Sequence, residues 1–311
     1  MVAVNKRVYG PQAAVINGVD AGGMMTATID SGYDNVMRTG PDGLAVPVVD
    51  REIQFVRGSV TSQDWIHLID LLTGTVGTYV FYERKSGVAA ATGYVMHTIT
   101  APVIHNARLS MNQKGYLAVS FDFECRAADE AKTILDMWTM TDGQDVPTYV
   151  SAARGGWRVE TCLHGDVPVY HVTAFDFAIT MQLLKACNDA DVAYTAVDAR
   201  EDGMRTAGSL SFGDAEIKDT TLELKCQLLV LAAAASMVIT VTQSAGATSK
   251  VITIARTIFA TAGANGNAQS DYSGYRANFE VTNDPSTPYT LLGTLVGEEY
   301  LYRIITIEDK V

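Results

Sequence analysis

The sequence has little charge, and its basic residues form no cluster. Charged side chains make up 19% of its 311 residues, below the roughly 25% that is usual for soluble domains. Such a surface is often covered by other subunits, although a compact β protein with Ser- and Thr-rich faces has the same composition. The net charge is −12, which argues against ordinary nucleic-acid binding because phosphates are neutralised by Lys and Arg. The negative net charge does not exclude a surface along which DNA slides without binding.

Paired cysteines and long apolar runs are also missing. Cys125, Cys162, Cys187 and Cys226 lie too far apart for a zinc or thioredoxin motif, so we expect buried free thiols in a reducing compartment. The N-terminus has no apolar signal core. The best membrane candidate is the uncharged stretch Cys226–Ser249. Its apolar part, Leu228–Val241, is shorter than the about 20 residues that a membrane-spanning helix needs. We therefore expect no membrane span.

Motifs of catalysis and cofactor binding are absent as well. The histidines have none of the spacings that seat a metal ion, and we interpret His67 and His97 as packed or edge residues. Gly208–Gly213 has the wrong spacing for a nucleophile elbow, and Gly18–Gly23 lacks the lysine of a phosphate-binding loop. The sequence therefore predicts a protein that is not an enzyme, with no catalytic residue, no cofactor and no metal site.

What the sequence does contain is the same kind of segment twice. "KGYLAVSFDFE" at Lys114–Glu124 returns as "SGYRANFEVTND" at Ser273–Asp284. The separation between the two Gly-Tyr pairs also aligns Thr78–Arg84 with Met237–Gln243, and Tyr94–Ile104 with Thr253–Gly263. Met-Arg-Thr occurs at 37–39 and 204–206, each time after an Asp-rich turn, and Val8-Tyr9 recurs at Val169-Tyr170.

Five matches in one order predict a tandem duplication. The unit is too long for a solenoid repeat of about 20–50 residues, so each copy is a domain. We place one domain at 1–145 and the other at 146–311, with the boundary in "TDGQDVP" at 141–147.

Most of the predicted secondary structure is strand, because short β-branched or aromatic segments alternate with Gly, Asn and Pro. The predicted strands are Val46–Val60, Thr78–Glu83, Gly93–Thr100, Ile104–Ser110 and Tyr116–Cys125. An apolar stripe predicts a flanking helix at Ser62–Leu72, matched in the second copy by Glu223–Leu231, where helix and strand are hard to tell apart. Further helices are expected at Ala128–Met140 and Met181–Ala190, and Thr261–Gly274 has the composition of a mobile loop.

Negative charge gathers in the first part of each copy. Between Asn188 and Glu223 nine acidic residues face three basic ones. The stretch is either a solvated face or an acidic surface that becomes continuous when copies assemble. The candidate residues for such a surface are Asp30, Asp34, Asp198, Glu201, Asp202, Asp214 and Glu216.

A repeated β domain with one helix, acidic turns before Met-Arg-Thr and a Gly-Tyr-x-Ala strand near its end resembles the tail tube proteins of long-tailed bacteriophages. The resemblance covers nearly the whole chain and rests on architecture rather than on a signature. It implies a mainly β fold of two tandem tail-tube-like β-sandwich or barrel domains, each with a flanking helix. Six such domains form a ring in that family, and members with two domains form it from three chains.

The resemblance further implies a structural virion protein whose homotrimeric rings stack into a tube that conducts DNA without binding it specifically. Its partners would be further copies and the tape measure, terminator and distal tail proteins, in a virion tail assembled in the host cytoplasm. Two loops are candidates for ring-to-ring contact, with Arg38, Pro41, Asp42, Gly263, Asn265 and Asn267. Alternatives are a double jelly-roll capsid protein, a distal-tail or baseplate ring protein, a β-rich enzyme or a carbohydrate-binding adhesin.

Overall fold

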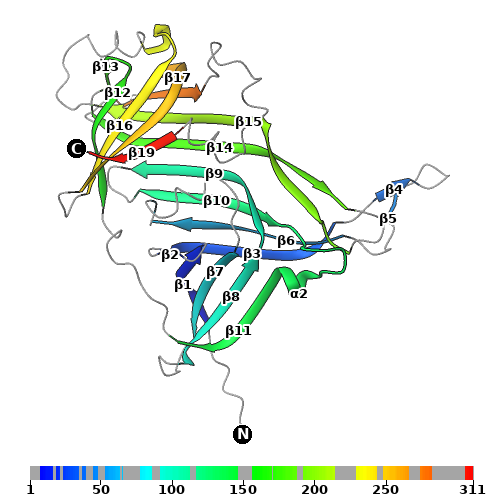
Figure 1. The fold of residues 1–311 in the computed structure, drawn as a ribbon. Coiled ribbons are helices and arrows are strands. Elements are labelled where there is room, and N and C mark those ends of the chain that lie inside the picture. The colour runs from blue at the N-terminus through cyan, green and yellow to red at the C-terminus, as the bar shows by residue number, and fades with distance from the viewer. Residues whose placement is uncertain are drawn as a thin grey trace. The chain divides into compact units, whose positions relative to one another are not determined.

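The protein is mainly β, as the sequence predicted, and its strands pair antiparallel (Figure 1). The computed structural model describes residues 8–16, 19–21, 24–34, 37–39, 45–47, 53–63, 65, 78–85, 92–112, 117–145, 156–169, 171–187, 192–213, 229–243, 248–265, 274–281 and 305–310. None of the helices within these ranges is long and apolar enough to cross a membrane.

The strands up to β11 form a first strand set. Its bounds are β1 (Val8–Ile16), β2 (Val19–Ala21), β3 (Met24–Asp34), β6 (Ile53–Ser62), β7 (Thr78–Lys85), β8 (Tyr94–Thr100), β9 (Pro102–Asn112), β10 (Ala118–Cys125) and β11 (Trp138–Gln144). One sheet has the order β11-β8-β7-β1-β2, and the other strands follow the order β9-β10-β6-β3. β4 (Met37–Thr39) and β5 (Ala45–Pro47) pair only with each other among the described strands.

The remaining strands form a second strand set. Its bounds are β12 (Trp157–His164), β13 (Val167–Pro168), β14 (Val172–Ala186), β15 (Ala196–Gly213), β16 (Ala235–Gln243), β17 (Ser249–Asn265), β18 (Gly274–Val281) and β19 (Ile305–Asp309). Their order is β13-β12-β16-β17-β18-β15-β14, with β19 on the first part of β17. β14 is followed in the same sheet by β9.

Two compact units emerge from the contacts of the chain. Unit 1 comprises Met1–Ala107, Ser120–Ala153 and Met181–Gly203, and unit 2 comprises Arg108–Val119, Arg154–Thr180 and Met204–Val311. They differ from the predicted segments 1–145 and 146–311, because the strands β9, β10, β14 and β15 each contribute residues to both units.

Alternation of apolar and polar residues builds the cores. In β10, Val119, Phe121 and Phe123 are buried while the residues between them are partly exposed. Tyr79 packs edge-on against the rings of Phe121 and Phe123, with centroids 6.2 and 5.8 Å away. In unit 2 the ring of Phe279 stacks on Phe177 and meets Phe259 edge-on. Side chains on alternate positions of a strand share a face, which is why this pattern predicted the strands correctly.

Helices are fewer and shorter than predicted. The helix expected at Ala128–Met140 is only α2 (Ile134–Met137), and Trp138–Met140 instead pairs with β8 as the start of β11. Met181–Ala186 belongs to β14 and is not helical. Ser62 ends strand β6 rather than capping a helix, although Trp65 is helical. Residues 66–72 and most of Glu223–Leu231 lie outside the described residues.

Two predicted turns and part of a predicted loop are also strand. The acidic segments at 30–34 and 198–203 lie within β3 and β15, and Thr261–Asn265 continues β17. Asn265 pairs with Gly274 and Gly263 with Arg276 of β18. The ladder supplies hydrogen bonds to backbone groups that composition alone assigned to turns.

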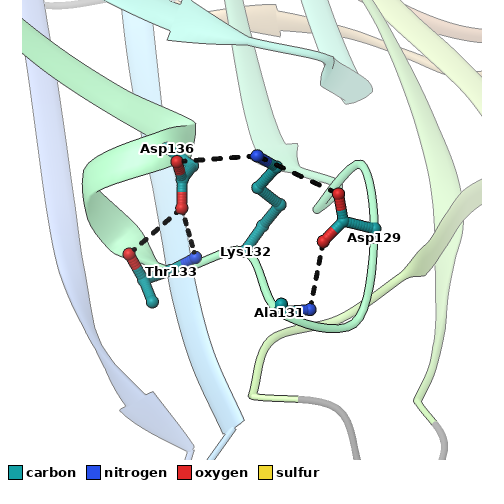
Figure 2. A network of polar contacts seen from close by, with 5 residues as sticks. All are labelled: Asp129, Ala131, Lys132, Thr133 and Asp136. Carbon is teal, nitrogen blue, oxygen red and sulfur yellow. Dashed lines mark hydrogen bonds and ion pairs between the residues drawn. The ribbon is translucent and has the colours of Figure 1, made fainter.

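The start of α2 is held by a small polar network on the surface (Figure 2). The backbone N–H and the hydroxyl of Thr133 donate to Asp136 Oδ2 at 2.9 and 3.3 Å. This backbone hydrogen bond lowers the pKa of Asp136. Lys132 Nζ lies 3.9 Å from Asp129 and 3.8 Å from Asp136. An acidic residue in the first turn is the expected partner of the free N–H groups at a helix start.

Cysteine burial follows the prediction only in part. Cys125 and Cys162 are free and buried, and burial raises the pKa of both thiols, that of Cys162 to about 12. Cys187 is exposed, contrary to the prediction, because it follows the last residue of β14. Cys226 lies outside the described residues.

His67 lies outside the described residues. His97, for which the sequence predicted a packed or an edge position, is packed. Its ring stacks on Phe81 at 4.4 Å and on Trp138 at 6.0 Å. Trp138 Nε1–H donates to His97 Nδ1 at 3.2 Å, so the Nε2–H of His97 is the group that donates to Glu83 at 3.0 Å.

Replacing Trp138 with Phe should therefore destabilise unit 1 by about 1 kcal/mol, because it leaves the buried Nδ1 atom without a donor. Urea unfolding monitored by circular dichroism measures the change. Met140→Leu, on an exposed position of the same strand, is the control and should be neutral. Equal stability of Trp138→Phe and the parent would show that this hydrogen bond contributes nothing.

Candidate assembly surface

The same residue-to-residue pairing occurs in both strand sets. Ile99 in β8 pairs with Tyr79 of β7 on one side and Trp138 of β11 on the other. Ile254 in β17 pairs in the same way with Met237 of β16 and Ile305 of β19. Ile99 and Ile254 therefore occupy equivalent positions.

The match continues into the neighbouring strands. Tyr79 pairs with Ile16 of β1, which pairs with Val19 of β2. Met237 pairs with His164 of β12, which pairs with Val167 of β13. The sheet β11-β8-β7-β1-β2 therefore has its equivalent in β19-β17-β16-β12-β13.

A backbone kink follows each of the two equivalent isoleucines. Ala101 has φ 48° and Arg256 has φ 42°, a left-handed conformation that is uncommon for residues other than Gly. Beyond the kink each chain joins another pair of strands, β9 beside β10 and the second part of β17 beside β18.

The strands beyond the kinks also match. Asn106 Nδ2 donates to Asp122 Oδ2 at 3.1 Å, and Asn278 Nδ2 donates to Thr261 Oγ1 at 2.8 Å. Both hydrogen bonds join the strand after the kink to its neighbour. Asn106 and Thr261 are therefore equivalent, and two residues further on Arg108 corresponds to Gly263.

Two glycines complete the comparison. A Cβ atom on Gly58 would lie 2.1 Å from the carbonyl oxygen of Thr28 and 2.8 Å from Phe123 Cζ. A Cβ atom on Gly208 would lie 2.4 Å from the carbonyl oxygen of Asp176 and 2.1 Å from Phe279 Cζ. A phenyl ring thus lies on a glycine in both sets. The nearby carbonyl oxygen belongs to β3 in the first set and to β14 in the second, so β3 corresponds to β14 and Thr28 to Asp176.

The sheet junction between β9 and β14 carries an ion pair in its middle. Arg108 Nε and Nη2 donate to Asp176 Oδ1 and Oδ2 at 2.5 and 2.9 Å. The two side chains are 58% and 31% exposed. The hydrogen bonds that Arg108 donates to the Asp176 carboxylate raise the pKa of Arg108. This fork-to-fork geometry is the strongest form of Arg–carboxylate contact and fixes the relative position of two strands.

A second cluster of charged and polar side chains lies at the end of β14. Lys185 Nζ, at the end of β14, lies 2.8 Å from Glu124 Oε1 and 3.3 Å from Asp34 Oδ2. The hydroxyl of Tyr194 donates to Asp34 at 2.6 Å, and the Lys185 ammonium lies over the Tyr194 ring. The Glu124 side chain is only 5% exposed. Burial, followed by the hydrogen bond to Asp34, raises the pKa of Tyr194.

The segment after β14 adds backbone contacts within unit 1. Gln54 N–H donates to Val192 O at 2.9 Å and Ala127 N–H donates to Tyr194 O at 2.8 Å. Gln54 and Ala193 also form a parallel bridge. The connection between β14 and β15 therefore lies on the ends of β6 and β10.

β11, β2, β13 and β19 are outer strands of their sheets, and two further margins, in β3 and β17, also have no partner among the described strands. β3 is the last strand of its sheet and pairs only with β6. The part of β17 from Ile258 to Asn265 pairs only with β18. These margins are the equivalents of β14 and β9, the two strands that do pair with each other. Free strand margins are templates for pairing with another chain.

The predicted acidic residues do not form one patch within the described part. Asp30 is exposed on β3, whereas Asp34 is bound by Lys185 and Tyr194. Asp198, Glu201 and Asp202 lie in β15, but their side chains are outside the description, as are Asp214 and Glu216 altogether. The acidic surface therefore stays a prediction.

The residues predicted for ring-to-ring contact do not lie together in described loops. Gly263 and Asn265 lie in strand β17, not in a loop, and Arg38 lies in β4. Pro41, Asp42 and Asn267 are outside the described residues. Neither Arg108–Asp176 nor Lys185–Glu124 was predicted. The partners are far apart along the chain, and no motif connects them.

The described residues show no gathering of His, Cys, Asp or Glu that could hold a metal ion. Compared with known proteins, the chain matches no protein-family model and no curated protein.

Proposed function

We propose that this protein is a structural virion protein of a bacteriophage tail, in which tandem tube-like domains join copies of the chain into rings that stack as a DNA conduit. The first part of the proposal is that the chain contains a tandem duplication. It is supported by the matched pairings around Ile99 and Ile254, and by the matched glycines Gly58 and Gly208.

One observation carries the assembly. Within the chain β9 pairs with β14, while β17 and β3, their equivalents, have no partner among the described strands at the corresponding margins. The β17 margin of one copy is therefore complementary to the β3 margin of the next. Such a head-to-tail contact produces a ring if its rotation closes and a filament if it does not. Closure into a barrel would pair these two margins.

Fusion of two domains makes every second contact in such a ring intramolecular, which raises its effective concentration. The intrachain junction also contains the pair Arg108–Asp176, whereas the equivalent residues between chains are Gly263 and Thr28. Since a bidentate carboxylate occupies the Arg108 guanidinium, this cation is not free to hold phosphate. That supports a wall past which DNA moves without specific binding.

A cysteine pair tests the interface directly. Arg108 touches Asp176, so their equivalents Gly263 and Thr28 should meet across two copies. In a Cys187→Ser background, Thr28→Cys with Gly263→Cys should give reducible covalent multimers on oxidation, ending in a closed trimer. Non-reducing electrophoresis and mass measurement detect them. Thr28→Cys with Thr139→Cys, on exposed β11, is the matched control and should remain monomeric.

A monomer from the first pair at high protein concentration would overturn the proposal. A closed species of six chains would show that the duplication is used differently. Negative-stain images then separate stacked tubes from single rings, the form expected of a distal-tail ring protein.

A further inference from the structure

We propose that one face of the sheet β3-β6-β10-β9-β14-β15-β18-β17 lines the channel of the assembled ring and is the surface along which duplex DNA moves. This polar face is the side of those strands that lies opposite their buried side chains; of β17 only the part after Arg256 belongs to it. The inference rests on the proposed function, because only a closed ring gives the polar face an inside.

In unit 1 the polar face consists of small side chains that bind one another. Val60 of β6 is buried, whereas Ser59 before it is partly exposed on the other side of the strand. The hydroxyls of Ser59 and Thr28 share a hydrogen bond of 2.7 Å between β6 and β3. Asn106 Nδ2 of β9 donates to Asp122 Oδ2 of β10 at 3.1 Å. Polar groups of neighbouring strands therefore satisfy each other across this face.

In unit 2 the polar face has the same character. Leu210 of β15 is buried and follows the partly exposed Ser209, and Thr180 of β14 is exposed next to a buried isoleucine. Asn278 Nδ2 of β18 donates to the hydroxyl of Thr261 on β17 at 2.8 Å. Both units thus present hydroxyl and amide groups on the side away from their cores.

The cations of the polar face have carboxylates beside them. Arg108 is held by Asp176 through two hydrogen bonds. Arg57 stands directly opposite Asp30 in the pairing of β6 with β3, a position in which opposite charges attract. Arg276 is exposed on β18. A strong grip on a phosphate backbone needs several free Lys and Arg side chains, and this arrangement offers few.

These features fit a polyanion that passes close by, and they fit a protein partner poorly. The centre of a protein interface is rich in aromatic and other apolar side chains, whereas the polar face carries Ser, Thr and Asn at its middle positions. Its hydroxyls and amides are already bonded to neighbours. We therefore assign the polar face to DNA that moves without being held.

The position of the cores decides which side of a ring this face would occupy. The free margins of β3 and β17 belong to the sheet of the polar face. Tyr79 of the other sheet packs on Phe121 from the opposite side. A closed barrel has less room inside than outside, so the cores and their second sheets must point outward. Eight strands of each chain would enter the barrel, so three chains exceed the roughly 16–18 strands that already leave an aqueous channel.

Gold labelling tests the location. In a Cys187→Ser background, Ser59→Cys and Thr180→Cys place a thiol on the polar face, one in each unit. Thr139→Cys and Thr161→Cys are matched controls on exposed positions of β11 and β12. After assembly each variant is labelled with a maleimide gold cluster, and circular dichroism verifies its folding. Negative-stain views along the ring axis should show gold at the central hole for the first two variants and at the outer edge for the controls.

Gold at the outer edge of intact rings for the first two variants would overturn this inference and leave the ring standing. If the unlabelled parent forms no rings, the inference fails together with the proposed function.

Lysines test the contact with DNA. Ser59→Lys with Thr180→Lys and the control Thr139→Lys with Thr161→Lys carry the same added charge, and both are assembled with linear duplex DNA and treated with nuclease. The first pair should protect DNA and release it between about 50 and 200 mM salt, because about six lysines per ring lose roughly 10³ in affinity over that range. The control should leave DNA digestible. No protection by the first pair, or equal protection by both, would show that DNA does not run along the polar face.

Discussion

Replacing Gly58 or Gly208 with Ala should lower the free energy of unfolding by about 3 kcal/mol or more, the upper end of the range for overpacked cores. At Gly58 the new methyl carbon would lie 2.1 Å from the carbonyl oxygen of Thr28, and at Gly208 2.4 Å from that of Asp176. A backbone oxygen in a ladder cannot move away as the end of a side chain can. Two paired strands would have to separate, and a buried phenyl ring would have to leave the glycine.

Denaturant unfolding of the isolated chain, at concentrations where it does not assemble, measures the loss. Gly263→Ala is the matched control. It lies in a strand as well, but nothing stands within 4 Å of its Cβ position, so the change should stay within about 0.5 kcal/mol. Trimming the ring with Phe123→Leu should not rescue Gly58→Ala, because the clash with the backbone remains. Parent-like stability of both Ala variants would contradict the glycine packing on which the comparison of the strand sets depends.

Lys185→Met should destabilise the protein by about 3 kcal/mol, because it leaves the carboxylate of Glu124 buried and uncompensated. The Glu124 side chain is 5% exposed, and its contact with Lys185 Nζ at 2.8 Å is the one that offsets its desolvation. Asp34 also contacts the Lys185 ammonium, but in the variant it would still accept the hydrogen bond from the Tyr194 hydroxyl, and its side chain is more exposed. The loss therefore comes mainly from Glu124.

A double-mutant cycle separates the pair from the burial of its members. Adding Glu124→Gln to Lys185→Met should recover a large part of the loss, since a neutral amide is far less costly to bury than an unpaired charge. Lys132→Met is the surface control. Its contacts with Asp129 and Asp136 are long and exposed, so it should cost less than about 1 kcal/mol. An equal effect of both lysine variants would show that Glu124 is not desolvated in solution.

The sequence predicts a duplication, but it does not predict which residues of the two strand sets correspond. The matches of Thr78–Arg84 with Met237–Gln243, and of Tyr94–Ile104 with Thr253–Gly263, join equivalent elements with shifts of a few residues. The Met-Arg-Thr match fails, because residues 37–39 form β4 and residues 204–206 lie inside β15. Short identical peptides carry little information, whereas strand partners are constrained by every backbone hydrogen bond of the ladder.

By itself the sequence determined the mainly β character of the chain, the positions of β7, β8, β9 and β10, and that His97 is a packed or edge residue. These depend on alternation of neighbouring residues, which is a local property. Only the tertiary structure decided that 181–186 and 138–140 are strands, that Arg108 meets Asp176 and Lys185 meets Glu124, and that β3 and part of β17 lack partners among the described strands. A sheet is built from pairings between distant segments, so which strand has a neighbour and which does not is settled by the whole fold.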